Sequence, residues 1–212
     1  MADKLTELVF ILDRSGSMAG LEADTIGGYN AVLTEQQAAP GEVLVTTVLF
    51  DHEYELLHRR ADLRTVKPLT EQEYFVRGST ALLDAMGTTI AAIKAAHRVG
   101  GHPPARVLFT IITDGMENSS REYTYPQIKQ MVEEQRKEHG WEFIFLGANI
   151  DAFAVAGRMG ISADMTANFH ADAQGVRLNY QVVNEAVSDF RCDRLCADWK
   201  RPIEEDYRSR KK

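Results

Sequence analysis

The sequence predicts an α/β protein with a doubly wound, mostly parallel central sheet, one antiparallel edge strand and helices on both faces. Two observations favour this fold class. Short runs of β-branched and aliphatic residues alternate with longer segments of helical periodicity, and the first run, residues 6–12, is nearly all apolar, as is typical of a strand covered on both faces. Alternating strands and helices form right-handed βαβ units, which build a parallel sheet between two helical layers.

Strands are expected in the apolar, β-branched runs that turn residues bound. In chain order these are residues 6–12, 42–50, 54–58, 106–113, 141–146 and 165–169. The second and third strands form a hairpin around the polar break Asp51-His52-Glu53. We expect the third at a sheet edge, because Arg59 and Arg60 directly after it discourage pairing with another chain.

Helices are expected where apolar residues recur three and four positions apart. They cover residues 21–38, 81–98, 126–139, 151–159 and 174–190. Pro126 suits the first turn of its helix, and Asp151 is a candidate N-cap. The helix over residues 174–190 is expected to be the last one.

Length and charge limit the organisation of the chain. Its 212 residues suit one domain over residues 1–192, followed by a charged C-terminal extension, residues 193–212, that we expect to be flexible. The formal net charge of −7 disfavours nucleic-acid binding, because nucleic-acid-binding proteins need a basic excess.

No segment has the roughly 20 apolar residues that cross a bilayer, and the N-terminus lacks a signal-peptide pattern. We therefore expect a cytoplasmic protein.

The two cysteines, Cys192 and Cys196, are four residues apart. This spacing indicates one face of a helix, and two thiols alone cannot complete a structural zinc site. We expect them to be reduced thiols.

Three polar clusters mark the candidate site. They are Asp13-Arg14-Ser15-Gly16-Ser17, Gly78-Ser79-Thr80 and Thr113-Asp114-Gly115. Ligands of such sheets bind beyond the carboxyl ends of the strands, so Asp13 and Asp114 converge if their strands are neighbours, and the loop bearing Thr80 closes the third side. Oxygen donors without a nearby cysteine or histidine favour a hard cation, Mg²⁺ first, with Mn²⁺ or Ca²⁺ as alternatives.

Together, the three clusters resemble the metal-ion-dependent adhesion site (MIDAS) of von Willebrand factor type A (vWA) domains, which have a Rossmann-like fold. The first cluster has the form D-x-S-x-S, and the resemblance covers residues 5–190. It implies a complete MIDAS in which Ser15, Ser17 and Thr80 coordinate the metal through their hydroxyls. By the same resemblance, Asp13 and Asp114 hold coordinating waters or bind directly in some states. It also implies a stand-alone intracellular member of the family.

The chemistry of this donor set favours an anionic ligand at the metal. Mg²⁺ held by neutral hydroxyls is incompletely neutralised at its open position and attracts an anionic ligand, which in the family is often a Glu or Asp of a partner protein. We expect a non-enzymatic adaptor or assembly factor, and the resemblance implies an AAA-type ATPase complex as one partner. Met18, Met116 and Glu117 adjoin the clusters and are expected at the partner surface, where methionine makes adaptable contacts. A packing role for the two methionines is the other interpretation.

Two alternatives stay open. A Mg²⁺-dependent phosphatase-like hydrolase could use Asp13 as its nucleophile, although no lysine lies in the three clusters and Ser15 stands where a second carboxylate would help. In the other alternative, the metal only rigidifies three loops of a structural subunit. Sequence motifs for acyl transfer, P-loop nucleotide hydrolysis and dinucleotide binding are absent.

Overall fold

Six strands form one sheet in the order β3-β2-β1-β4-β5-β6, as the computed structural model shows for residues 5–100, 106–193 and 195–210. The strands are β1 (Thr6–Asp13), β2 (Val43–Phe50), β3 (Tyr54–Asp62), β4 (Arg106–Thr113), β5 (Glu142–Ala148) and β6 (Thr166–Phe169). Every neighbouring pair is parallel except β2 and β3, which form the antiparallel hairpin at one edge. The predicted fold class is confirmed.

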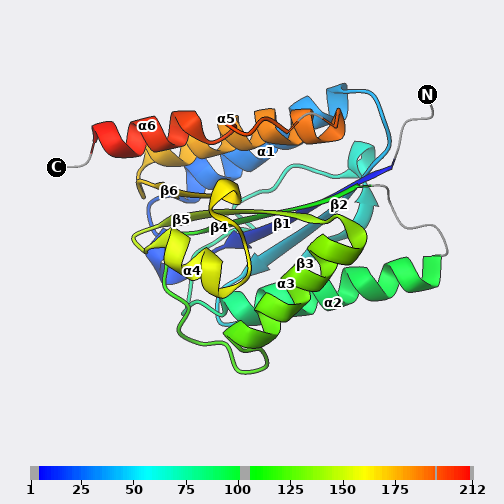
Figure 1. Ribbon diagram of the computed structural model, residues 1–212. Helices are drawn as coiled ribbons and strands as arrows, with labels where there is room; N and C mark the ends of the chain where they lie inside the picture. Colours follow the sequence, from blue (N-terminus) through cyan, green and yellow to red (C-terminus); the bar gives the residue numbers. More distant parts are fainter. Residues whose placement is uncertain (1–4, 101–105, 194, 211–212) are drawn as a thin grey trace.

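Helices cover both faces of the sheet (Figure 1). They are α1 (Glu22–Ala38), α2 (Leu82–Gly100), α3 (Tyr125–His139), α4 (Ala152–Arg158), α5 (Ala173–Arg191) and α6 (Arg201–Ser209). Helices α1, α5 and α6 lie on one face, and α2, α3 and α4 lie on the other. The helices of the described ranges lack the length and apolar character that crossing a bilayer requires.

Local signals at the helix ends confirm two details of the sequence analysis. Pro126 lies in the first turn of α3, which also has a capping box between Thr124 and Gln127 and ends at Gly140 in the left-handed conformation. Asp151 is the N-cap of α4, where its carboxylate accepts a hydrogen bond of 3.0 Å from the backbone N–H of Ala154.

The end of the chain differs from the prediction. We expected no helix after residue 190, but α6 packs against β6 and α5. Two apolar side chains four residues apart, Trp199 and Ile203, are buried beneath it, and Trp199 Nε1 donates to the carbonyl oxygen of Asp164. The many charges of this segment indicated a solvated extension, and they masked a short amphipathic face. Its described part therefore packs against the domain.

The cysteines also lie differently from the prediction. Cys192 is the C-cap of α5, so Cys196 falls outside the helix, and the two thiols do not share a helix face. Both are free and exposed.

The edge strand β3 carries one arginine that points inward. Arg60 has a positive φ of 45° beside a register shift in the β2–β3 pairing, and its Nε lies 2.9 Å from a carboxylate oxygen of Glu7. Glu7 is fully buried on β1 and also contacts His97 Nε2 at 2.8 Å. Arg60 thus compensates the buried charge of Glu7 at the amino end of β1. We had expected Arg60 only to discourage pairing of the edge strand with another chain.

Aromatic stacking fills the core between β4 and β5. Phe109 is fully buried and stacks on Trp141 and Phe143, with ring centroids 5.4 and 4.7 Å apart. We predict that Phe109→Ala lowers the free energy of unfolding by about 3–5 kcal/mol, because it removes both stacking contacts and leaves a cavity. Urea denaturation measures this loss. The control, Leu56→Ala on the exposed edge strand, should stay within about 0.5 kcal/mol of wild type, and a similar loss in both variants would contradict the prediction.

Candidate metal site

The pairing of β1 with β4 brings the first and third polar clusters together. The two strands are parallel neighbours, with Leu12 opposite Ile112, so the clusters that follow them start side by side at the carboxyl edge of the sheet. The helices that follow in the chain, α1 and α3, lie on opposite faces (Figure 1). This reversal of direction opens a crevice at the strand ends, the place where ligands bind in open α/β sheets.

Three hydroxyl oxygens surround one point in this crevice. A methyl group built on the Cα of Gly115 would lie 2.9 Å from Ser17 Oγ, 3.0 Å from Thr80 Oγ1 and 3.8 Å from Ser15 Oγ. The two serine oxygens are 3.0 Å apart. Adjacent ligands of an octahedral Mg²⁺ are about 3 Å apart, since each bond is about 2.1 Å long. The spacing of the two serines therefore fits this geometry, and Gly115 leaves the space free because it has no side chain.

Asp13 is buried next to Ser15, and both of its carboxylate oxygens accept hydrogen bonds. Its Oδ1 accepts from the backbone N–H of Ser15 at 2.7 Å, and its Oδ2 accepts from Thr113 Oγ1 at 2.5 Å. Burial raises the pKa of Asp13 to about 6; the hydrogen bonds from Ser15 and Thr113 lower it, and the nearby charge of Asp114 raises it slightly. A cation in front of Asp13 would favour its charged form.

Asp114 is the second buried carboxylate of the site. Its Oδ1 accepts a hydrogen bond of 2.6 Å from Ser17 Oγ, while its Oδ2 is buried without a partner among the described residues. Burial raises the pKa of Asp114, and the hydrogen bond from Ser17 lowers it. A buried carboxylate oxygen without a donor is costly. A cation or a metal-bound water facing it would remove this cost.

The donor set fits a hard cation. Among the described residues, no three His, Cys, Asp or Glu side chains form a cluster that could hold a metal ion, so a nitrogen- or sulfur-rich site of the zinc type is not formed there. Three hydroxyls and two carboxylates are instead the oxygen ligands that Mg²⁺ prefers. The structure therefore brings Asp13, Ser15, Ser17, Thr80 and Asp114 together, as the sequence analysis expected.

The loop that follows Asp114 fixes Thr80 and the start of α2. The side chain of Asn118 accepts from the backbone N–H of Thr80 at 2.9 Å. The carboxylate of Glu117 accepts from the backbone N–H of Leu83 at 3.0 Å, and also from Ser119 and Ser120. We expected Glu117 at a partner surface. It is instead half-buried and caps the first turn of α2, so both of its carboxylate oxygens already accept hydrogen bonds within the chain.

The two methionines beside the clusters have opposite environments. Met18 is 1% exposed and packs in the hydrophobic core, because the short 3₁₀ helix Gly16–Met18 turns its side chain inward. The expectation that Met18 contacts a partner is therefore corrected, and the packing interpretation holds. Met116 is 69% exposed.

An ion-pair network around the buried Arg14 holds the first loop, and it was not among the features predicted from the sequence. Arg14 is fully buried; its Nε lies 2.9 Å from Asp51 Oδ2 and its Nη1 lies 2.7 Å from Glu55. The same Asp51 oxygen accepts from Arg77 Nε at 2.9 Å. The available signal was the place of Asp51, which directly follows β2 and so stands at the same edge of the sheet as Asp13. We had interpreted it only as part of a turn.

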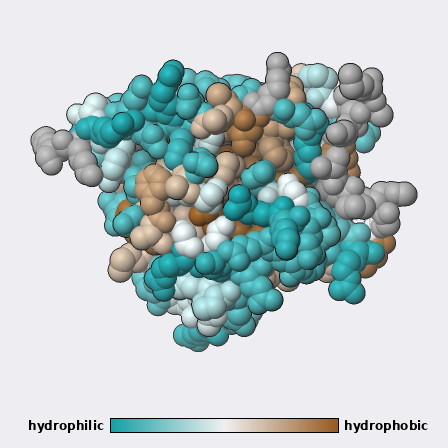
Figure 2. All heavy atoms as spheres, viewed as in Figure 1, coloured by the Kyte–Doolittle hydropathy of each residue, from teal (hydrophilic) through white to brown (hydrophobic). Residues whose placement is uncertain are grey.

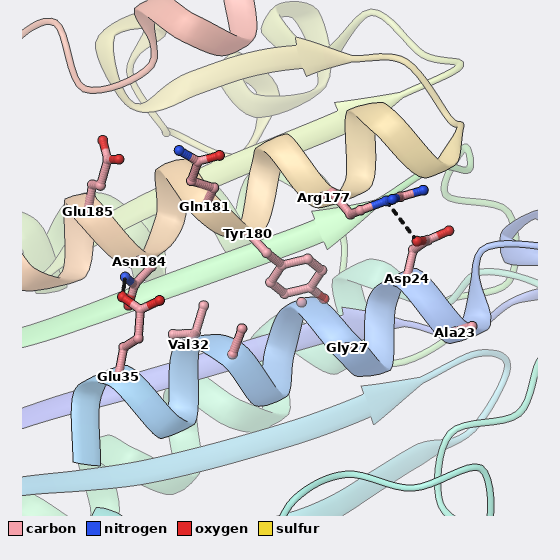
Figure 3. A pocket seen from close by; sticks show the side chains of 12 residues that line it. Ala23, Asp24, Gly27, Val32, Glu35, Arg177, Tyr180, Gln181, Asn184 and Glu185 are labelled. Carbon is pink, nitrogen blue, oxygen red and sulfur yellow. Dashed lines mark hydrogen bonds and ion pairs between the residues drawn. The ribbon is translucent and has the colours of Figure 1, made fainter. Parts of the chain in front are cut away.

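A cavity of about 590 Å³ lies elsewhere, between α1 and α5. Figure 3 shows the ring of Tyr180 on α5 pointing toward α1, and an ion pair of 3.1 Å between Arg177 and Asp24 at one end. A side chain at position 28 would come within 2.3 Å of the Tyr180 ring, so Gly28 permits this close helix contact. None of the residues of the three polar clusters lines this cavity.

The comparisons with known proteins show the fold. No protein-family model matches the sequence, and no curated protein does. A mutant of the PilB minor pilin from Streptococcus sanguinis superposes with a TM-score of 0.65 and 12% identity over 94% of this chain and 63% of the solved one. A von Willebrand factor type A protein from Catenulispora acidiphila superposes with a TM-score of 0.59 and 12% identity, over 86% of this chain and 42% of the solved one. The third structure is proximal thread matrix protein 1 of the mussel byssus, solved with a zinc-occupied MIDAS motif. It superposes with a TM-score of 0.53 and 11% identity, over 87% of this chain and 46% of the solved one.

These likenesses establish a vWA-like α/β fold for the chain. The chain spans less than two thirds of the length of each of these solved structures.

The ion pair between Arg14 and Asp51 yields a prediction for stability. Burial raises the pKa of Asp51, but the hydrogen bonds from Arg77, the Glu53 backbone and Arg14 outweigh it, so the pKa lies below its ordinary value. The lowered pKa means that this stabilisation is complete above the unfolded-state pKa, about 4, and is lost as the pH falls through the folded-state pKa. Asp51→Asn should therefore cost about 3 kcal/mol at neutral pH, because it leaves the buried Arg14 charge without its main partner.

Urea denaturation at neutral pH and at about pH 3 measures this cost. The difference between wild type and Asp51→Asn should shrink at the acidic pH. The control Glu53→Gln, at the exposed partner of Arg77, should change stability by less than about 1 kcal/mol at either pH. A constant difference at both pH values would show that the charge of Asp51 is not what stabilises the loop.

Proposed function

We propose that the chain is a metal-dependent protein-binding module, in which Ser15, Ser17 and Thr80 hold Mg²⁺ and Asp13 and Asp114 support it from behind. The observation that carries the proposal is the convergence of three hydroxyls on one point beside Gly115, with the unpartnered oxygen of Asp114 nearby. When bound, the metal would supply a positive charge that an acidic side chain of a partner protein can neutralise.

The exposure of the individual site residues indicates where a partner can approach. Ser17 and Gly16 are exposed, whereas Asp13, Ser15 and Thr80 are buried. A partner can therefore approach the site past Ser17, which is exposed. Both carboxylates are buried, so they leave this approach open to an incoming acidic side chain. The zinc-occupied MIDAS of the mussel protein supports metal binding by a fold of this kind.

The alternative phosphatase-like chemistry has less support in the geometry. A nucleophilic Asp13 would need a free oxygen that faces the substrate, but both of its oxygens accept hydrogen bonds and its side chain is buried. The nearest cation in the sequence, Arg14, is engaged by Asp51 and Glu55 and so is not available to balance charge on a phosphoryl group. We therefore propose a non-enzymatic role.

The proposed setting comes from the resemblance to vWA proteins. We propose a stand-alone intracellular adaptor or assembly factor with a complete MIDAS, and an AAA-type ATPase complex stays one expected partner.

Thr80→Ala tests the metal site. Removing one of three hydroxyl ligands should abolish Mg²⁺ binding in calorimetric titrations, while the thermal unfolding of the metal-free protein changes little. Thr34→Ala is the matched control, because this threonine is exposed on α1 and its hydroxyl only donates to the carbonyl of Asn30. Unchanged Mg²⁺ binding by Thr80→Ala would reject the proposed ligand set.

The same variants separate the three functions. A protein captured from lysate by wild type with Mg²⁺, and lost with chelator or with Thr80→Ala, would support the binding module. Hydrolysis of a phosphoester that Asp13→Asn removes would support the enzyme instead. Capture that ignores the metal, together with no turnover, would favour the structural role.

A further inference from the structure

Exposed apolar side chains concentrate at the edge of the sheet that holds the candidate metal site. The exposed large apolar residues of the described ranges are Leu56, Phe75, Val99, Met116 and Phe153. Three of them lie at this edge: Phe75 precedes the Thr80 loop, Met116 follows Asp114, and Phe153 lies in the first turn of α4 after β5. Val99 lies at the far end of α2. In the space-filling view, hydrophobic residues reach the surface at the end of the molecule that holds α4 and at other places on the same face (Figure 2).

Phe75 is fixed beside the first metal loop. The centroid of its ring lies 5.3 Å from the guanidinium carbon of Arg14 and 5.4 Å from that of Arg77, and its side chain remains 44% exposed. The backbone N–H of Arg77 donates to the carbonyl of Arg14 at 2.9 Å, and that of Gly16 donates to Gly78 at 3.1 Å. The Phe75 ring is therefore presented on the side of the site that faces β2.

Met116 stands on the other side, which faces β4 and β5. It directly follows Gly115, whose backbone lies against the Ser17 and Thr80 hydroxyls. The backbone N–H of Asn118 donates to Thr80 at 3.0 Å, so the loop that carries Met116 is tied to the metal loops. Its side chain is 69% exposed, and thioethers adapt to irregular apolar surfaces.

We propose that Phe75 and Met116 form a pair of apolar contacts on either side of the metal, and that they select a partner segment whose acidic residue is flanked by apolar side chains. This inference rests on the proposed function. A small hydrophilic anion would use only the metal and would leave both side chains in water. A protein segment would bury them, and removing apolar surface from water contributes about 25 cal/mol of favourable free energy for each Å².

The partner's charge pattern follows from the same contacts. The acid is required at the metal, and aromatic or aliphatic residues are favoured next to it on both sides. Arg14 and Arg77 already have carboxylate partners, so a second acidic residue near Phe75 should add little. We therefore expect one acid with apolar flanks, rather than an acidic run.

A displayed library of random peptides around one fixed aspartate tests this surface. Peptides selected on wild type in Mg²⁺ should be enriched in apolar residues beside the aspartate. Phe75→Ala and Met116→Ala should each weaken a selected peptide by about tenfold, which corresponds to about 1.4 kcal/mol. Both variants should bind Mg²⁺ as wild type does. Val99→Ala is the matched control, since it removes an exposed apolar side chain at the opposite end of α2 and should have no effect.

The possible failures are distinguishable. Metal-dependent peptides without an apolar preference, or peptides that bind Phe75→Ala and Met116→Ala as tightly as wild type, would overturn the inference and leave the metal-dependent module standing. Equal weakening by Val99→Ala would also overturn it. If no peptide binds in a metal-dependent way, both the inference and the proposed function fail. Dimerisation on adding Mg²⁺, measured by sedimentation, would identify a second copy as the occupant and overturn the inference.

Discussion

The parallel pairing of β1 with β4 is the constraint on which the site depends. The two strands are about a hundred residues apart in the sequence, yet their register places Leu12 opposite Ile112. A shift of one residue would turn every inward side chain to the other face of the sheet. Because both strands are buried on both faces, such a shift would also disrupt the close packing of their side chains against the helices on each face. The contact between Ser17 and Asp114 is therefore fixed by the packing of the core rather than by the loops themselves.

Electrostatics shape the site as strongly as packing does. Two carboxylates, Asp13 and Asp114, are buried at the same strand ends, where their mutual repulsion and loss of hydration are unfavourable. The neighbouring cation, Arg14, could have relieved this cost, but its guanidinium group turns away to Asp51. The folded chain thus keeps two buried carboxylates next to neutral hydroxyls. Such an arrangement would stabilise a bound cation at the expense of the metal-free state.

The sequence predicted the features that depend on local pattern. The runs that form β1 and β4 are nearly all apolar, and the polar clusters after them contain hydroxyl and carboxylate side chains that the fold brings close together. The misses depend on contacts between distant segments. Nothing local to Glu117 shows that the start of α2 will lie above it, and nothing next to Arg14 shows that Asp51 will be its partner. Met18 was misplaced because a single turn of 3₁₀ helix decides which way it points.

Helix α6 was missed for a different reason. Its apolar residues are few, and its charges outweigh them in any average over the segment, although Ile203 is almost fully buried. The spacing of Trp199 and Ile203 was visible, but it gains meaning only once β6 and α5 provide a surface to cover. Short helices that form by docking are generally hard to predict, since isolated helices of this length are unstable in water.

Backbone hydrogen bonds tie the three loops of the site to one another. Gly16 donates to Gly78, Arg77 donates to Arg14, and Asn118 donates to Thr80. Loops fixed in this way lose little conformational entropy when a ligand binds, so more of the contact energy remains as affinity. Under the proposed function, a metal bond to a carboxylate would be alike for every acidic partner. Discrimination between partners would then come from the side chains around the metal, and Met116 is the most exposed large apolar side chain at that edge among the described residues.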